Sequence, residues 1–273
     1  MPGLEAGGCA LLTSRFLVLE FGWRKSTLLR CLNVQGAGPH EQFEAGVAEL
    51  FRAIDGSKAR CRSWKLVVGE DWARPVVLPL AAGSLSEEEV ETALREYARR
   101  TYGDQDQEWH WCWGPQADSL VAVSWPHAGW LALARGMAQR GCTLSSAKPM
   151  GADLAGGLIV IKDEMWLVIA AATLSVMRWS SGVLLDWFVL PDPAEGGRVE
   201  ALCLRLEQEA ARRGDTCRDI VLVDFETVGG GESSRIWEGM RHAGWSVHHC
   251  AQREIRGSLA WRLRQVALSS WPA

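Results

Sequence analysis

The order of the secondary-structure elements predicted along the chain repeats once, and this repeat constrains the fold more than any other feature. In the first half, strand patterns at residues 15–20 and 27–34 form a β-hairpin that precedes a helix, further strands and further helices. In the second half, strand patterns at residues 166–169, 173–179 and 183–190 precede a helix, a strand and another helix. Two such rounds predict an α/β fold of two related lobes with mixed sheets.

The chain length of 273 residues suits one domain built from two similar lobes. We predict a first lobe over residues 15–150 and a second lobe over residues 151–273. The second lobe begins with a glycine-rich loop at residues 151–157 and ends in a helical tail. In this tail, residues 253–271 combine arginines with apolar residues at helical spacing, which favours a closing helix packed on the second lobe. The alternative is an amphipathic segment that docks on a membrane surface or a partner.

Some helix ends and turns have local signals of their own. A capping box predicts the start of a helix, either at Ser84 with Glu87 or at Ser86 with Glu89. A Gly-Pro pair at residues 114–115 predicts a turn between strands at 109–113 and 119–124. The Ser-Ser-Gly sequence at residues 180–182 predicts the turn of a second β-hairpin.

Composition and charge exclude several classes of protein. The chain is 48% hydrophobic and 23% charged, which is typical of a globular protein, and its net charge of -4 gives no attraction toward nucleic acid. The longest apolar runs, such as residues 165–177, are shorter than the roughly 20 residues that span a bilayer. Residues 1–14 lack the pattern of a signal peptide, and the eight cysteines form no C-x-x-C pair. These features predict a cytoplasmic protein with reduced cysteines and without a transmembrane segment.

Tryptophan is unusually frequent, with 15 Trp against 2 Tyr and 6 Phe. Each tryptophan buries a large area, so most are predicted to lie in the core or between the lobes. Any exposed tryptophans would mark an interaction surface, because aromatic residues dominate the binding energy of protein interfaces.

The first predicted hairpin carries a resemblance to a known family. Residues 18–26, VLEFGWRKS, resemble the first phosphate loop of the actin, sugar kinase and Hsp70 superfamily. Within this superfamily the chain is most similar to the PilM-like and GspL-like proteins, the cytoplasmic actin-like components of type IV pilus and type II secretion platforms. The similarity extends over roughly residues 15–250, with short matching sequences such as residues 73–79 and 165–169. The resemblance implies a two-lobe actin-like fold, which is related to the RNase H fold.

The resemblance also implies two phosphate hairpins, whose amide groups hold the phosphates from both sides. In the first hairpin, the acidic Glu20 is kept, but Gly22 is followed by the bulky Trp23. The second hairpin is expected at residues 168–177, where residues 170–175 read AAATLS, including Thr173 and without aspartate or glycine. We therefore predict a degenerate phosphate site that does not hydrolyse ATP.

A third element of the family is a glycine-rich turn that contacts the adenosine. Gly229, Gly230 and Gly231 follow Asp224 and precede a predicted helix, so they either form this turn or serve as a flexible connection. The candidate vestigial nucleotide-binding residues are thus Glu20, Gly22, Thr173, Gly229, Gly230 and Gly231. If this site survives, ATP and magnesium are its expected ligands; otherwise we expect no cofactor.

Other kinds of site have less support in the sequence. Glu20 and Asp224 resemble the strand-end carboxylates of an RNase H-like nuclease, but two-metal chemistry needs more converging carboxylates and a basic surface. His248, His249 and Cys250 are adjacent on a predicted strand, so their side chains alternate between its faces and do not form a metal site. A G-x-S-x-G sequence, which would indicate a hydrolase, does not occur.

The sequence thus predicts a non-catalytic actin-like scaffold at the cytoplasmic face of the inner membrane. Its expected partner is a short cytoplasmic segment of a membrane-anchored assembly protein, with other actin-like subunits as a further partner class. The partner-binding candidates are Trp23, in the first hairpin turn, and Trp261, in the tail. The alternative is an ATPase or small-molecule kinase of the same superfamily.

Overall fold

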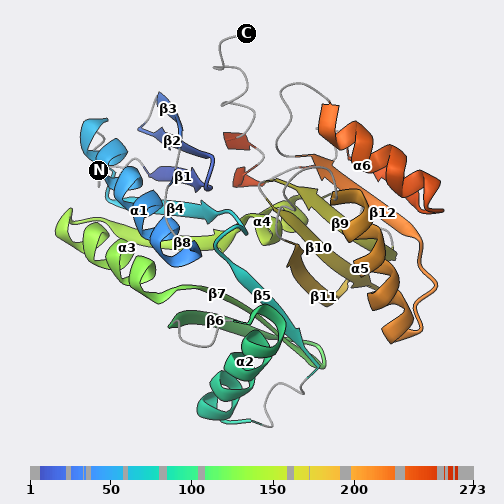
Figure 1. Cartoon of the computed structure of the whole chain (residues 1–273). Helices are drawn as coiled ribbons and strands as arrows, with labels where there is room; N and C mark the ends of the chain where they lie inside the picture. Colours follow the sequence, from blue (N-terminus) through green and yellow to red (C-terminus); the bar gives the residue numbers. More distant parts are fainter. Residues whose placement is uncertain are drawn as a thin grey trace.

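The structure is a computed structural model of the whole chain (Figure 1). It describes residues 7–22, 26–32, 34, 38–57, 61–79, 85–103, 108–158, 163–171, 173–190, 198–224, 231–250, 255, 258–260 and 262–263.

The first of two five-stranded sheets is built mainly from the first half of the chain. Its strand order is β3 (Ser26–Cys31), β2 (Phe16–Phe21), β1 (Gly8–Leu12), β4 (Ser63–Val68) and β8 (Thr143–Pro149). β1, β4 and β8 are parallel, whereas β2 is antiparallel to both of its neighbours, so the sheet is mixed as predicted. The apolar sequence of β1 is typical of a strand that is buried on both faces, and β2 and β4 share this character except at Glu20 and Lys65. β1 and β8 were not predicted.

Two helices, α1 (Pro39–Gly56) and α3 (His127–Gln139), cover the outer face of this sheet (Figure 1). They approach closely because α3 presents glycines to aromatic rings of α1. A Cβ atom on Gly129 would lie 2.4 Å from Cδ1 of Phe43, and one on Gly136 would lie 2.2 Å from Cε2 of Phe51. The two phenylalanines therefore occupy the space that side chains at these positions would need.

Replacing Gly136 with valine is expected to lower the free energy of unfolding by about 1–3 kcal/mol, because the new side chain overlaps the Phe51 ring. Ala138→Val on the exposed face of the same helix is the matched control and should cost only about 0.5 kcal/mol, the difference in helix propensity. Urea unfolding curves measure both. Equal losses in the two variants would show that the close contact of α1 and α3 contributes nothing.

The second five-stranded sheet repeats the strand order of the first. Its order is β11 (Val183–Leu190), β10 (Leu174–Ser180), β9 (Glu164–Ala170), β12 (Asp219–Asp224) and β13 (Ser246–His249), with β9, β12 and β13 parallel. The predicted turn at residues 180–182 is confirmed, with φ angles of 49° at Ser181 and 78° at Gly182. Because β2 and β12 lie in different sheets and neither is an edge strand, the predicted two-lobe fold is confirmed.

Helices α5 (Arg198–Arg213) and α6 (Gly231–His242) cover the outer face of the second sheet (Figure 1). Leu202, Leu206 and Ala210 of α5 are buried against this sheet. These three residues recur every four positions, so helical spacing places them in one buried stripe along α5.

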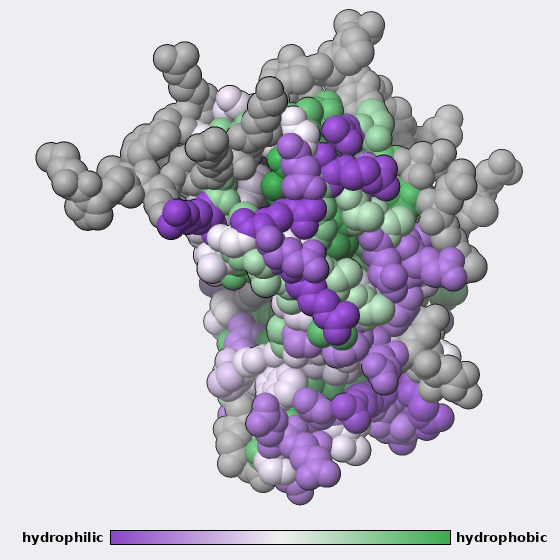
Figure 2. Space-filling view, turned by 90° about the vertical axis from the view of Figure 1, so that its left-hand side faces the viewer, coloured by the Kyte–Doolittle hydropathy of each residue, from purple (hydrophilic) through white to green (hydrophobic). Residues whose placement is uncertain are grey.

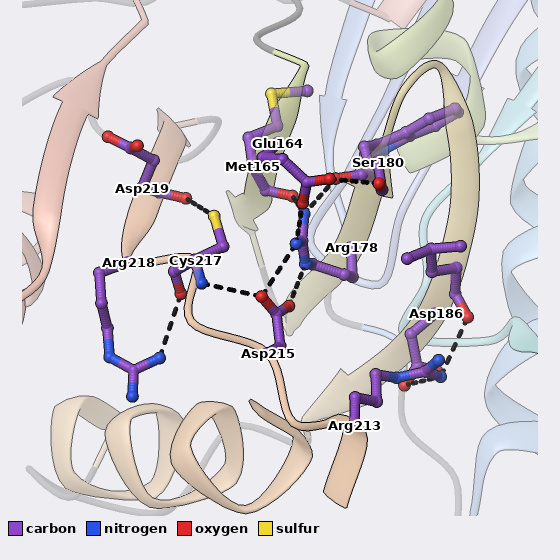
Figure 3. A network of polar contacts seen from close by, with 12 residues as sticks. Glu164, Met165, Arg178, Ser180, Asp186, Arg213, Asp215, Cys217, Arg218 and Asp219 are labelled. Atoms are coloured by element: carbon purple, nitrogen blue, oxygen red, sulfur yellow. Dashed lines mark hydrogen bonds and ion pairs between the residues drawn. The ribbon is translucent and has the colours of Figure 1, made fainter. Parts of the chain in front are cut away.

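A buried arginine joins the end of α5 to the second sheet (Figure 3). The guanidinium of Arg178, on β10, bonds to both carboxylate oxygens of Asp215 and to Glu164, and it donates to the carbonyl oxygens of Met165 and Trp179. The Arg178 side chain is only 2% exposed. All of its nitrogen atoms thus have acceptors, which is what burial of a charge requires.

A small sheet is inserted between β4 and β8. It has the order β5 (Arg74–Leu78), β7 (Ser119–Pro126) and β6 (Trp109–Gln116), and α2 (Glu87–Tyr102) packs on one face. The helix starts with the predicted capping box of Ser86 and Glu89. The turn predicted at residues 114–115 is wrong, because both residues pair with β7 and the turn follows at Ala117 and Asp118. Pro115 is tolerated there because β6 is an edge strand.

Helix α4 (Met150–Gly157) and the C-terminal segment lie between the two large sheets (Figure 1). The loop predicted at residues 151–157 is therefore wrong: its small residues fit the narrow space between the sheets, where Gly151 contacts both sides. Ile255 bridges Leu158, and Ala260 and Leu263 are fully buried in the same core as β1 and β4. The small sheet also reaches the second lobe, because β5 lies beside β11. The proposed boundary between residues 150 and 151 stays a prediction.

Candidate functional site

Each of the two sheets carries a β-hairpin turn at the carboxyl end of a parallel strand, and α4 begins between these two ends. In α/β folds, ligands bind beyond the carboxyl ends of parallel strands. The β1–β2 turn, residues 13–15, follows the carboxyl end of β1, and the β9–β10 turn, residues 171–173, follows the carboxyl end of β9. Gly151 marks where the two sides meet, because a Cβ on it would lie 2.6 Å from Oε1 of Glu70 and 3.2 Å from Oγ of Ser175.

The first of these turns differs from the one proposed from the sequence. Gly22 follows the end of β2, whereas the turn at the carboxyl end of β1 is Thr13-Ser14-Arg15. Glu20 pairs with Cys9, near the amino end of β1, and so lies at the opposite end of the sheet from this turn. The structure therefore places Glu20 and Gly22 away from the carboxyl ends of the parallel strands β1, β4 and β8.

The amide groups of the first turn already have acceptors within the protein. The amide of Ser14 donates to Oδ2 of Asp71 at 2.5 Å. The amides of Arg15 and Phe16 donate to Oγ1 of Thr13 at 3.3 and 3.1 Å, and the amide of Thr13 donates to the carbonyl oxygen of Phe16. A phosphate site needs amide groups that are free to bond the ligand. The carboxylate of Asp71 thus accepts from the Ser14 amide, where a bound phosphate would otherwise accept.

Glu70 and Asp71 follow the carboxyl end of β4, and Asp71 lies beside the first turn. Glu70 is 1% exposed; its Oε1 accepts from the amide of Gly151, at the start of α4, and its Oε2 has no partner among the described residues. Burial raises the pKa of Glu70 to about 8, although the hydrogen bonds from backbone amides oppose this shift. Burial also raises the pKa of Asp71, with its hydrogen bonds to Ser14 in opposition. The sequence analysis missed both residues.

The second turn lies where the sequence placed it, between β9 and β10. The amide of Ala171 bonds to the carbonyl oxygen of Thr173, which closes the turn at 3.0 Å. Beyond it, the buried Ser175 accepts from Nε1 of Trp187 at 3.0 Å. Thr173 is half-buried at this turn. Neither a carboxylate nor a glycine is present at its described residues, although Asp224 lies at the adjacent end of β12, where it pairs with Ala170.

The other predicted candidates lie partly outside the described residues. Gly231 is the first residue of α6, while Gly229 and Gly230 are not among the described residues. Asp224 is buried at the end of β12. The partner-binding candidates Trp23 and Trp261 also lie outside the described residues.

The C-terminal segment holds Glu20 in an ion pair. Nη1 of Arg262 lies 2.9 Å from Oε1 of Glu20, and Oδ2 of Asp153 accepts from Oγ of Ser258 and from the amide of Ala260, each at 2.8 Å. Glu20 is 8% exposed. Its charge is thus balanced by the tail of the chain, which fixes that tail to α4 and to β2.

The tryptophans that the structure describes mainly fill the cores. Trp64, Trp72, Trp111, Trp125, Trp166, Trp187 and Trp245 are buried. Trp130, on α3, is half-buried and stacks between Trp125 and His110, with ring centroids 5.3 and 4.8 Å away. Among the described tryptophans none is exposed. Their abundance therefore reflects packing in the described part of the chain.

No group of three or more potential metal-binding side chains occurs among the described residues. The first turn has no free amide for a phosphate, and the second has no carboxylate. None of the described helices is long and apolar enough to span a membrane.

Two sheets with the same strand order and with equivalent hairpin turns define the actin-like ATPase fold, and solved structures bear this out. No family model matches the chain, and no curated protein matches it. A protein of unknown function from Bacteroides thetaiotaomicron with an actin-like ATPase fold has a TM-score of 0.65 at 8% identity, over 95% of each chain.

Two further similar structures come from proteins of type IV pilus biogenesis and type II secretion. The PilM–PilN type IV pilus biogenesis complex matches with a TM-score of 0.59 and 13% identity, over 97% of this chain and 95% of that one. The cytoplasmic domain of EpsL, an inner-membrane component of the type II secretion system of Vibrio cholerae, matches with a TM-score of 0.50 and 13% identity, over 98% and 97%. At these identities the likeness establishes the fold alone.

Proposed function

We propose that this protein is a non-catalytic actin-like scaffold that docks onto a short cytoplasmic segment of a membrane-anchored protein, in an assembly of the type IV pilus or type II secretion kind. The observation that carries the proposal is the first hairpin turn, whose amides bond to Thr13 and Asp71 rather than remaining free for phosphate. A phosphate bound at this turn would have to displace Thr13 and Asp71 from these amides, which favours a binding role over ATP hydrolysis.

Two of the similar structures support the same proposal, because each belongs to a protein that works in an assembly. PilM is found in a complex with PilN, and EpsL is an inner-membrane component with a cytoplasmic domain. By analogy, we expect this protein to be cytoplasmic and peripheral to the inner membrane, held there by a membrane-anchored partner, with other actin-like subunits as a second class of partner.

Magnesium–ATP is expected to leave the melting temperature unchanged and to undergo no turnover. A ligand at 100 times its dissociation constant would raise the free energy of unfolding by about 2.7 kcal/mol, which thermal unfolding detects readily. Magnesium chloride without nucleotide is the control. A nucleotide-dependent shift would argue against an abandoned site.

The partner is best identified by crosslinking in the native cell, followed by binding measurements on a defined peptide. Crosslinked membrane proteins are identified, and the cytoplasmic segment that carries the crosslink is synthesised. This isolated segment should bind the purified protein in solution. If only soluble proteins are captured, or if the segment does not bind, the docking role is refuted.

The alternative function is an ATPase or small-molecule kinase of the same superfamily. The carboxyl groups of Glu70 and Asp71, at the carboxyl end of β4, favour this enzyme function, because one of them would then hold magnesium or activate water. Turnover of ATP by the wild type that is abolished in Asp71→Asn would support this alternative.

A further inference from the structure

One edge of the first sheet is open. β3 is the first strand in the order β3-β2-β1-β4-β8, and no described strand pairs with its other side. The amide of Leu32 donates to the carbonyl oxygen of Arg15, toward the β2 side. Because backbone groups alternate in direction along a strand, Leu29 and Cys31 direct their amide and carbonyl groups outward. An open edge of this kind can accept a further strand.

A groove runs beside this edge, between β3 and α1. Its volume is about 570 Å³, and it is lined by the end of the strand and by one stripe of the helix, namely Arg30, Cys31, Leu32, Val34, Ala45, Glu49 and Arg52. The helix residues recur at intervals of four and three, so they form one face of α1. Figure 2, which views this side of the molecule, shows hydrophobic patches between hydrophilic residues in its upper half.

The charges in the groove favour an acidic occupant. Arg30 and Arg52 both pair with Glu49, which leaves one positive charge in excess. The Arg30 and Arg52 side chains are 40% and 66% exposed, so both guanidinium groups can bond further acceptors. Leu32, Val34 and Ala45 provide apolar contacts next to these charges. Alternate residues of an added strand would face the groove, which suits a peptide with apolar and acidic residues in alternation.

We propose that this groove binds an extended segment of a partner protein, paired with β3 as a sixth strand and directing an aspartate or glutamate side chain at Arg30 and Arg52. The inference rests on the proposed scaffold function and names where and how the partner segment docks. The backbone ladder with Leu29 and Cys31 gives the affinity, and the two arginines select the acidic residue.

Cys31→Pro tests the backbone ladder. Cys31 is exposed, and proline at an outward-facing position of an edge strand removes one amide donor while the bonds to β2 remain. Cys31→Ala is the matched control, because it changes the side chain and keeps the amide. Thermal unfolding verifies that both variants fold.

The probe is a library of random twelve-residue peptides displayed on phage, selected on the wild-type protein. Selected peptides should alternate apolar residues with aspartate or glutamate. Their affinity should fall at least tenfold for Cys31→Pro and for the Arg30→Glu/Arg52→Glu double variant. It should be unchanged for Cys31→Ala and for Arg95→Glu, an exposed arginine of α2 that also pairs within its helix.

The proposal is overturned if no peptide is selected, if selected peptides bind Cys31→Pro as well as wild type, or if they lack acidic residues. It is also overturned if the wild type forms a dimer in sedimentation that Cys31→Pro abolishes, since β3 would then pair with a second copy. These failures are separate from failure of the scaffold function itself, which ATP turnover or the lack of a membrane-anchored partner would reveal.

Discussion

Arg178→Met should lower the free energy of unfolding by about 3–5 kcal/mol, the range for breaking a buried ion pair by removing one partner. Methionine fills most of the volume but leaves Asp215, whose side chain is 11% exposed, without its cation. The carbonyl oxygens of Met165 and Trp179 also lose their donor. Urea unfolding at pH 7 measures the loss, and the network concerned is the one in Figure 3.

The control for this variant is Arg95→Met. Arg95 pairs with Glu91 on the surface of α2, where the two side chains are 69% and 38% exposed, so the expected loss is below about 1 kcal/mol. If both variants lose the same amount, burial of Arg178 contributes nothing to stability.

Acid should narrow the difference between wild type and Arg178→Met. Burial opposes ionisation of Asp215, but the bond from Arg178 outweighs it and holds the pKa of Asp215 below its ordinary value. A carboxylate with a lowered pKa in the fold stabilises above its unfolded pKa of 3.8, and this contribution is lost as the pH falls through the folded value. The free energies of unfolding of the two proteins should therefore converge as the pH falls below 3.8.

Glu70→Gln should raise the free energy of unfolding by about 3 kcal/mol at pH 7. The pKa of Glu70 is raised from 4.5 to about 8, so the folded protein holds a proton that the unfolded chain releases. Between these two values, each unit of rising pH costs the wild type about 1.4 kcal/mol. Glutamine carries no charge and still accepts the hydrogen bond from Gly151.

The decisive measurement is the slope of stability against pH between 5 and 8. Between pH 5 and 8, the loss of stability with rising pH should be smaller in Glu70→Gln than in the wild type, by up to about 1.4 kcal/mol per pH unit. Glu96→Gln is the control, because Glu96 is exposed and its bonds to Arg99 and Arg100 lower its pKa to about 2. It should leave the slope unchanged. A wild type whose stability is constant from pH 5 to 8 would show that Glu70 is ionised throughout.

Much of the fold could be predicted because its strands and helices have strong local signals. The capping box at Ser86, the turn at residues 180–182 and the buried stripe of α5 each follow from short-range rules. The strands that were missed lack such signals. β1 reads GCALL, with small residues in place of β-branched ones, and β8 reads TLSSAKP, a polar edge strand. Backbone pairing decides their conformation: β1 pairs with β2 and β4, and β8 pairs with β4.

The error in the candidate site follows directly from the missing β1. Without it, β2 became the first strand, and the phosphate turn was assigned to residues 18–26 instead of residues 13–15. The two adjacent carboxylates at the end of the β4 strand pattern, Glu70 and Asp71, were the available signal for the site. The sequence alone does not place them in a site, because only the pairing of β1 with β4 brings Asp71 to Ser14.

The position of the last described residues has a consequence for how the protein is made. Ala260 and Leu263 are fully buried in the core that contains β1 and β4, and Arg262 neutralises Glu20 on β2. A ribosome delivers β1 and β2 first, yet the residues that complete their packing are synthesised more than 200 positions later. At about 5–20 residues per second, the first sheet waits roughly 10 s or longer for its closing segment. During this interval its inner face stays exposed, so nascent chains of this protein should be substrates for ribosome-associated chaperones.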